Sequence, residues 1–241
     1  MRSKIPEHIL EVLMSGEMGH CDLIPSGSNY TFFTTVTDKS NNGCRVIYKP
    51  KKGEATLWDF TTGTLYVREY ATYLLSEELE WNLVPPTVVR DGKFGIGSVQ
   101  LFIDYDPDEN FFTIREKRLL EFLRVCVFDI IINNADRKGG HCILDTDGYI
   151  WAIDHGVTFH SDLKLRTVIW DFAGKDIPEW ITKDLKILLN RFEEANGFGD
   201  KLYQLVEVKE VRAFRDRLVD LIDSPVFPSL ESYRSVPWPL L

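Results

Sequence analysis

The spacing of apolar residues predicts a chain that starts with strands and ends with helices. Apolar side chains recur at helical spacing in five segments: 6–14, 66–80, 114–132, 181–194 and 206–222. Runs of aromatic and β-branched residues between turn signals predict strands at 30–36, 44–48, 84–89 and 97–103. An acidic, proline-containing connector follows residue 103. We therefore expect an α+β fold with an antiparallel-sheet lobe over residues 1–103 and a mostly helical lobe over 104–241.

Two aspartates stand in the stretch that carries the most chemical information, residues 133–160. Asp136 follows a strongly apolar helical segment, and Asp154 ends the short apolar run YIWAI. Between them, two short strands flank an Asp-Gly pair, which is a strong hairpin signal. A hairpin brings its ends together, so we expect Asp136, His141 and Asp154 in one small volume. Such a group suits a divalent metal or proton transfer; two surface turns that happen to contain aspartate are the alternative.

Two charged residues in the first half of the chain stand beside apolar positions. Lys49 ends an apolar strand and precedes Pro50, so its side chain can point into a cleft. Glu69 falls near the apolar face of the helix predicted at 66–80, where a buried carboxylate requires a partner. Lys49 is the nearest candidate for that partner. An equally common alternative is that both side chains are charged groups exposed to solvent at the ends of their strand and helix.

Composition and charge narrow the class of protein. The net charge of −9 argues against a nucleic-acid partner and against binding to anionic membranes. No run approaches the roughly 18 apolar residues that a membrane span requires, and the N-terminus lacks the apolar core of a signal peptide. The four cysteines show neither zinc-ligand nor disulfide spacing. We expect a cytoplasmic protein without integral membrane association.

In order along the chain, these features resemble the catalytic core of phosphatidylinositol 3-/4-kinase-like proteins. The run D-R-K-G-G-H from Asp136 to His141 is similar to that family's D-R-H-x-x-N loop, and Asp154-His155-Gly156 is similar to its metal-binding D-F-G motif. The segments WDFTTGTL, LVPPTVV, GSVQLF and LRTVIWDFAG look like a bacterial group of PI3/4-kinase-related proteins. The resemblance covers nearly the whole chain and implies a two-lobed kinase-like fold that uses ATP with Mg²⁺ or Mn²⁺.

The resemblance implies an ATP-binding set in the strand-rich half of the chain. Its members are Ser26, Gly27, Ser28, Asn29, Lys49, Glu69, Gln100, Leu101 and Phe102. The turn at 26–29 would cover the phosphates, the lysine would hold them, and the glutamate would orient the lysine. Backbone groups of residues 100–102 would meet the adenine. Without the resemblance, the Ser/Gly turn would be only weak evidence for phosphate binding, because any β-meander contains turns of this kind.

The resemblance also implies a catalytic pair and a metal pair. Asp136 would act on the acceptor hydroxyl as base or orienting group, and Asp154 would chelate the metal that bridges the phosphates. Two positions depart from the family pattern. His141 replaces a metal-binding asparagine, which favours Mn²⁺ over Mg²⁺ or weakens activity. Lys138 replaces a histidine and could still assist the phosphoryl group electrostatically.

Several functions remain open at this stage. The main hypothesis is an ATP-dependent phosphotransferase acting on a protein hydroxyl or a small molecule; the net charge and the lack of a membrane-binding segment argue against a phosphoinositide acceptor. Nucleotidyl transfer on the same fold is a second possibility. A pseudokinase or ATP-binding interaction module is a third. The fourth, a metal-dependent hydrolase, would use His141, Asp154, His155 and His160, although no H-E-x-x-H motif is present.

Overall fold

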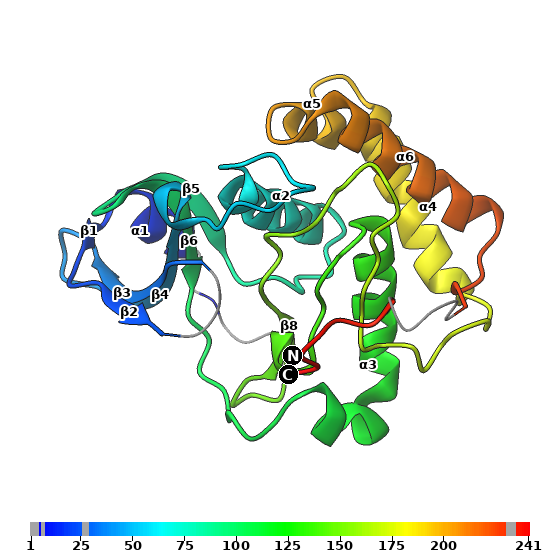
Figure 1. The fold of residues 1–241 in the computed structure, drawn as a ribbon, viewed down its shortest axis with the longest axis horizontal. Coiled ribbons are helices and arrows are strands. Elements are labelled where there is room, and N and C mark those ends of the chain that lie inside the picture. The colour runs from blue at the N-terminus through cyan, green and yellow to red at the C-terminus, as the bar shows by residue number, and fades with distance from the viewer. Residues whose placement is uncertain (1–4, 6–7, 26–28, 230–234) are drawn as a thin grey trace.

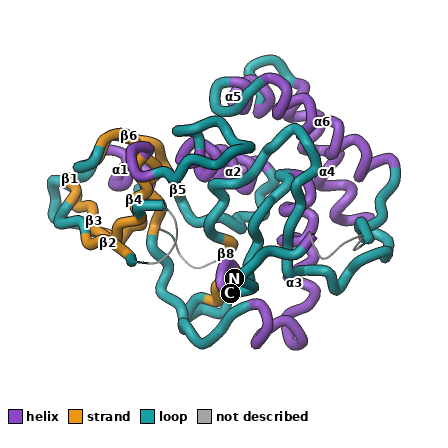
Figure 2. Tube along the Cα trace, in the orientation of Figure 1, coloured by secondary structure: helices purple, strands orange, loops and turns teal. Residues whose placement is uncertain are grey.

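A computed structural model describes residues 5, 8–25, 29–229 and 235–241 of the chain, and it has two unequal parts (Figure 1). The smaller part is an antiparallel sheet with one helix against it, and the larger part is mostly helical (Figure 2). The predicted α+β, two-lobed architecture is confirmed. The lobe boundary expected after residue 103 falls between the last strand of the sheet and the first long helix of the larger part, and its exact position stays a prediction.

The sheet of the smaller lobe follows the order β1-β3-β4-β6-β5, with β2 also paired to β3. Every strand pair is antiparallel. The strands are β1 (Glu17–Met18), β2 (Asp22–Ile24), β3 (Thr31–Thr37), β4 (Gly43–Pro50), β5 (Thr87–Gly92) and β6 (Gly95–Leu101). Strands β3 to β6 overlap the predicted segments, with ends that differ by one to three residues. Strands β1 and β2 are too short to show a periodic pattern.

Alternation along β4 sends neighbouring side chains to opposite faces of the sheet. Tyr48 is fully buried in a core that includes Val36, Val99 and the apolar side of α1 (Ile9–Ser15). Lys49, the next residue, therefore projects from the other face. Because strand side chains have a period of two, burying Tyr48 under α1 determines where the lysine points.

The second helix, α2 (Leu65–Glu78), joins the two lobes. It follows β4 and a 3₁₀ turn (η1, Lys51–Gly53) in sequence, but its buried apolar residues, such as Leu75, belong to the large core of the helical lobe. That core also contains apolar side chains from α3 (Phe111–Ile131), α4 (Glu179–Glu193), α5 (Phe198–Tyr203) and α6 (Val208–Asp223). Helix α2 is thus anchored to the larger lobe by hydrophobic packing.

The predicted hairpin after α3 is present and short. A 3₁₀ turn (η2, Gly139–His141) leads into β7 (Cys142–Leu144), which pairs antiparallel with β8 (Ile150–Ala152). The Asp145 carboxylate accepts from the N–H groups of Asp147 and Tyr149, and Gly148 has φ 78°, a conformation that glycine adopts at little cost. The hairpin closes as predicted and returns the chain toward the end of α3.

Candidate active site

Lys49 is held between two carboxylates that come from different parts of the fold. Its Nζ atom pairs with Oε1 of Glu69 on α2 and lies 3.0 Å from Oδ1 of Asp154, two residues beyond β8. Burial opposes the charge of the ammonium, but both carboxylates outweigh that effect and raise the pKa of Lys49. The attraction of Lys49 in turn holds the pKa of Asp154 well below its usual value. Both groups are therefore ionised at neutral pH.

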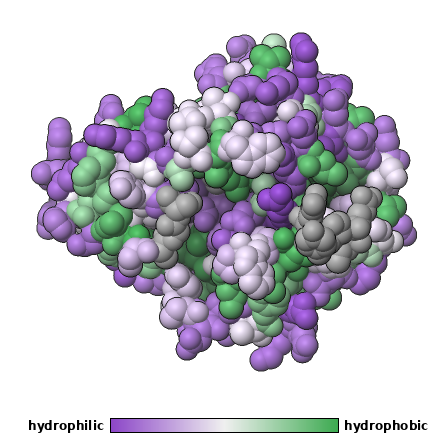
Figure 3. Space-filling view, in the orientation of Figure 1, coloured by the Kyte–Doolittle hydropathy of each residue, from purple (hydrophilic) through white to green (hydrophobic). Residues whose placement is uncertain are grey.

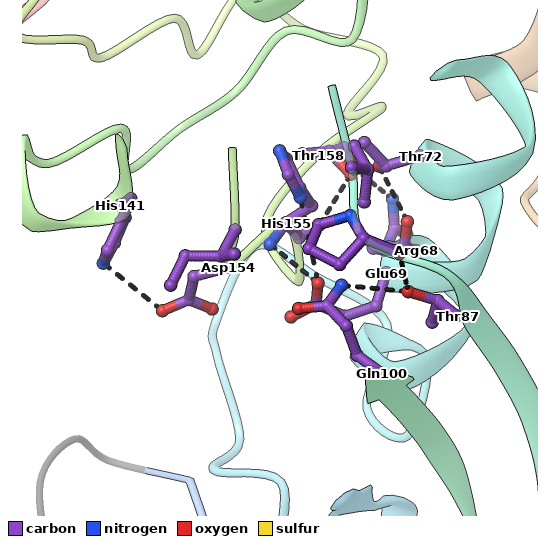
Figure 4. A network of polar contacts seen from close by, with 12 residues as sticks. Arg68, Glu69, Thr72, Thr87, Gln100, His141, Asp154, His155 and Thr158 are labelled. Carbon is purple, nitrogen blue, oxygen red and sulfur yellow. Dashed lines mark hydrogen bonds and ion pairs between the residues drawn. The ribbon is translucent and has the colours of Figure 1, made fainter. Parts of the chain in front are cut away.

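Glu69 is buried and uses both of its oxygens. Oε1 binds Lys49, and Oε2 accepts the backbone N–H of His155 at 2.9 Å. Figure 4 shows Glu69 beside His155. The chain turns into this contact through a left-handed conformation at Asp154, φ 61°. Such a conformation is uncommon for a residue with a side chain, and it occurs most often at functional sites. The turn places the Asp154 carboxylate on the lysine and the next N–H on the glutamate.

His141 presents one ring nitrogen to Asp154 (Figure 4), and its Nε2 lies 3.4 Å from Oδ2 of that carboxylate. The other nitrogen, Nδ1, lies 3.0 Å from the carbonyl oxygen of Asp136 and 3.3 Å from the backbone nitrogen of Lys138, so it can donate to the first or accept from the second. Donation to Asp136, the shorter contact, corresponds to the tautomer with the proton on Nδ1. In that tautomer the Nε2 lone pair faces the carboxylate, an arrangement typical of metal-ligating histidines. Burial lowers the pKa of His141 to about 4 despite the opposing charge of Asp154, so the lone pair is free at neutral pH.

The donor set suits a divalent ion that is shared with phosphate oxygens. Asp154 and His141 converge, but the described residues contain no group of three or more His, Cys, Asp and Glu side chains that could hold a metal ion, here or elsewhere. A complete protein cage is therefore not built here. Mg²⁺ and Mn²⁺ in phosphotransfer sites take one or two protein ligands and fill the remaining positions with phosphate and water. The residues present fit that pattern.

Asp136 lies on the loop between α3 and η2, and about a third of its side chain is exposed. Its Oδ2 pairs with Lys138 Nζ at 3.2 Å, and its backbone N–H is fixed by the Asn134 side chain at 3.0 Å. Partial burial raises the pKa of Asp136, while the charge of Lys138 opposes that change. A partly exposed carboxylate with a raised pKa is suited to accept a proton from a hydroxyl group.

Arg137 connects the loop of Asp136 to several other segments, and the sequence pattern did not reveal this role. It is fully buried and forms a bidentate ion pair with Asp129 of α3, which is buried too. Its guanidinium also donates to the carbonyl of Ile153 at 2.8 Å and contacts His155 Nε2 at 2.7 Å. Arg137 thus links α3, the loop of Asp136 and the strand end before Asp154. The sequence did contain one signal of this role. Asp129 is a lone acidic residue in the apolar run of α3, and a buried carboxylate requires a partner.

A second buried ion pair, between Arg68 and Glu210, attaches α2 to α6. Arg68 Nη2 lies 2.9 Å from Glu210 Oε1, and both side chains are almost completely buried. The same guanidinium donates to the carbonyl of Thr158 at 2.6 Å. Because Arg68 immediately precedes Glu69, this pair holds the helix segment that carries the active-site carboxylate.

The expected ATP-binding residues fall into three groups. Ser26, Gly27 and Ser28 lie outside the described residues. Asn29 accepts the Ala55 N–H at 2.7 Å, so its side chain fastens the end of that turn to the segment after η1. Lys49 and Glu69 meet as predicted, as described above.

The expected backbone contact of residues 100–102 with adenine stays a prediction, and the structure shows which of their backbone groups are already engaged. The N–H of Leu101 donates to Pro86 and that of Phe102 donates to Arg45, at 2.8 and 2.9 Å. The Gln100 side chain binds Thr87 (Figure 4). Sheet pairing continues to the end of β6 and one residue beyond, so these two donors are already in use. The predicted adenine contact would therefore use other backbone groups of this segment.

The hydrolase alternative is not supported by the geometry. His155 is fully buried beside Arg137, and burial keeps its pKa well below the usual value. His160 binds the carbonyl of Asp59 at 2.9 Å on a separate loop. The four side chains proposed for a hydrolytic metal centre are therefore not assembled around one point, since only His141 and Asp154 converge.

The last described residues lie against the loop that carries Asp136. Gly139 donates its N–H to the carbonyl of Leu240 at 2.7 Å, and Thr167 donates to Ser235 at 3.1 Å. Figure 1 shows this segment, in red, beside β8. Residues 235–241 thus form an irregular strap against this loop.

The fold and the site together define a kinase-like protein. Structures of hydra Fam20 with sugar, the golgi casein kinase and the Helicobacter pylori proinflammatory kinase CtkA resemble this chain with TM-scores of 0.58, 0.55 and 0.54. The similarity covers 89%, 90% and 89% of this chain and 86%, 74% and 94% of theirs, respectively. Sequence identity is only 15%, 17% and 12%, so these likenesses establish the fold.

Sequence comparison identifies the family. The family model for phosphatidylinositol 3- and 4-kinase matches residues 61–213. Protein Rv2133c of Mycobacterium tuberculosis is 35% identical over 265 aligned residues, which cover 95% of this chain and 94% of that protein. The chain therefore belongs to the phosphatidylinositol 3- and 4-kinase family, and the resemblance inferred from its motifs is confirmed. Among the described residues, no helix is long and apolar enough to cross a membrane.

Proposed function

We propose that this protein is an ATP-dependent phosphotransferase that acts on a hydroxyl group of a protein or a small molecule. The observation that carries the proposal is the cluster of Lys49, Glu69 and Asp154, in which one ammonium bridges a helix carboxylate and a carboxylate suited to a metal. Kinases require this cluster in assembled form. On the face in Figure 3, hydrophilic side chains occupy the middle of the molecule, between the strand-rich lobe and the helices. A highly charged nucleotide suits such a surface.

Each residue in the proposed site has a distinct task. Lys49, oriented by Glu69, would neutralise phosphate charge. Asp154 and His141 would hold the divalent ion, which supplies further charge neutralisation for the phosphates when it is bound. Asp136, whose pKa is raised by burial, would receive the proton of the acceptor hydroxyl.

Lys138 would act through charge alone. It lies 3.2 Å from Asp136 and carries its positive charge beside the proposed acceptor position. The charge of a lysine can stabilise a phosphoryl group during transfer.

The test is incubation of the protein with α-labelled and, separately, γ-labelled ATP in the presence of Mg²⁺ or Mn²⁺. Label should move from the γ position to an acceptor in a protein or metabolite extract and should not move from the α position. Transfer of the α label would replace the proposal with nucleotidyl transfer. Metal-independent ATP binding by calorimetry without any turnover would replace it with an ATP-binding module.

A further inference from the structure

A cavity of about 330 Å³ lies away from the Lys49 cluster, on the helical lobe. Its walls come from α3, from the β7–β8 hairpin, from the start of α4 and from the segment that follows α2. Trp81, Leu83 and Ile150 are almost completely buried in its wall. Leu120, 78% exposed, and Trp180, 44% exposed, leave a large apolar area open to solvent beside it. A volume of this size is at the lower end of the range for small-molecule sites.

The cavity contains one positive charge without a counter-ion. The guanidinium of Arg124 lies 5.1 Å from the ring centroid of Trp180 and 5.9 Å from that of Trp81. No carboxylate among the described residues forms an ion pair with it. The acid nearest in sequence, Glu121, has both oxygens engaged by Arg118 at 2.8 and 2.6 Å. Arg124 is therefore held by aromatic stacking while its N–H donors remain available.

The other polar groups of the wall have internal partners. The indole N–H of Trp81 donates to Asp184 at 2.8 Å. The hydroxyl of Tyr149 lies 2.9 Å from the carbonyl of Trp81 and 3.0 Å from that of Asn82. Glu121 also lines the cavity, and its carboxylate is neutralised by Arg118. What the cavity offers a ligand is thus the planar cationic donor group of Arg124 between aromatic and aliphatic walls.

We propose that this cavity binds a small aromatic carboxylate. A carboxylate matches the fork of the Arg124 guanidinium, which can donate two parallel hydrogen bonds to it. One or two fused rings fit the volume and would cover the exposed part of Trp180 and the Leu120 side chain. The site does not rest on the proposed phosphotransferase activity, because none of its lining residues belongs to the Lys49–Glu69–Asp154 cluster.

Calorimetric titration of the full chain with indole-3-carboxylate, in the absence of nucleotide, tests the site. Indole-3-carboxamide is the matched neutral probe. The carboxylate should bind at least about tenfold more tightly than the amide, as a charge-assisted hydrogen-bonded pair implies. Equal affinity for both probes would overturn the proposal, and so would the absence of carboxylate binding at millimolar concentration.

Substitutions of two arginines test whether the probes bind in this cavity. Arg124→Gln should remove the preference for the carboxylate. Arg115→Gln is the control, because Arg115 lies on the same helix, stacks on Phe111 at 5.6 Å and is outside the cavity wall. It should bind like the unmodified protein. An unchanged carboxylate preference in Arg124→Gln would contradict the assignment. Trp180→Ala, at an exposed position, should weaken both probes while the fold is retained, and undiminished binding in that variant would also count against it.

Discussion

Lys49 and Asp154 lie 105 positions apart in the sequence, yet Nζ of the lysine is 3.0 Å from Oδ1 of the aspartate. One residue belongs to the sheet and the other follows the hairpin of the helical lobe. Their contact draws the two lobes together across the proposed nucleotide site. Ion pairing at this point also keeps both side chains charged, which is the state that phosphate and metal binding require.

Asp154→Asn should abolish metal-supported ATP turnover and leave the fold intact, because the change is nearly isosteric but removes the charge. Metal charge stabilisation is worth several kcal/mol, so a loss of about 100-fold or more is expected in kcat. The measurement is label transfer from ATP, with thermal unfolding as the check on folding. Asp147→Asn, an exposed position on the same hairpin, should behave like the unmodified protein. Unchanged turnover in Asp154→Asn would remove this residue from the metal site.

Asp136→Asn should reduce phosphotransfer by about 10²–10⁴-fold, the usual contribution of a general base. ATP affinity should remain nearly the same, because the resemblance places Asp136 on the acceptor side. Calorimetric ATP binding and label transfer measured on one preparation separate these effects. Equal loss of binding and transfer would show that Asp136 acts on the nucleotide instead.

His141→Asn should shift the metal preference toward Mg²⁺, because an amide oxygen is a harder ligand than imidazole. The measured quantity is the ratio of turnover with Mg²⁺ to turnover with Mn²⁺. His20→Asn is the control, since His20 is a solvent-exposed histidine in the smaller lobe. If the ratio were the same in both variants, His141 would lie outside the metal's ligands.

Asp129→Asn should destabilise the fold strongly. The substitution leaves the buried guanidinium of Arg137 without its counter-charge, which typically costs about 3–5 kcal/mol. The free energy of unfolding from urea titration is the measurement. Glu193→Gln breaks an exposed pair with Arg215 and should cost about 1 kcal/mol or less. Similar losses in the two variants would mean that the buried pair contributes no more than a surface pair.

Lowering the pH should reduce the free energy of unfolding of the metal-free protein before its carboxylates titrate. Burial lowers the pKa of His141 to about 4 and that of His155 well below its usual value, whereas unfolded histidines titrate near about 6.5. Between these values the unfolded chain binds more protons, so the free energy of unfolding falls as the pH is lowered from about 6.5 to 4. His141→Asn should reduce the slope in this window, measured by urea titration at several pH values. An unaltered slope would contradict the assigned shift.

Local patterns predicted the elements and the meeting of the main side chains. These patterns are local in sequence, because each extends over only a few residues. They are the alternation in β4, the helical period around Glu69 and the Asp-Gly turn. They predicted Lys49 as the partner of Glu69 and the approach of His141 to Asp154. That the two pairs belong to one site was implied by the family resemblance, and the contact of Lys49 with Asp154 joins them. The hydrophobic period also located α3, α4 and α6 to within a few residues at each end.

What the sequence did not predict depends on contacts between distant segments. The pairing of Arg137 with Asp129 and of Arg68 with Glu210 follows from helix packing, which no local period encodes. The hydrogen bonds that engage the backbone N–H groups of Leu101 and Phe102 at the end of β6 also join distant segments, and the strand pattern did not predict them. Helix α5 has only 6 residues, too few to establish a period.

The buried contact of Arg68 with Glu210 limits how this protein can be regulated. Control of activity by swinging α2 away from the site would separate two charges that water does not reach, at about 3–5 kcal/mol. At such a cost, fewer than about one molecule in a hundred would have the helix displaced at rest. Displacement of α2 is thus a costly way to regulate the proposed activity, whereas the access of nucleotide, metal or acceptor could change without breaking this contact.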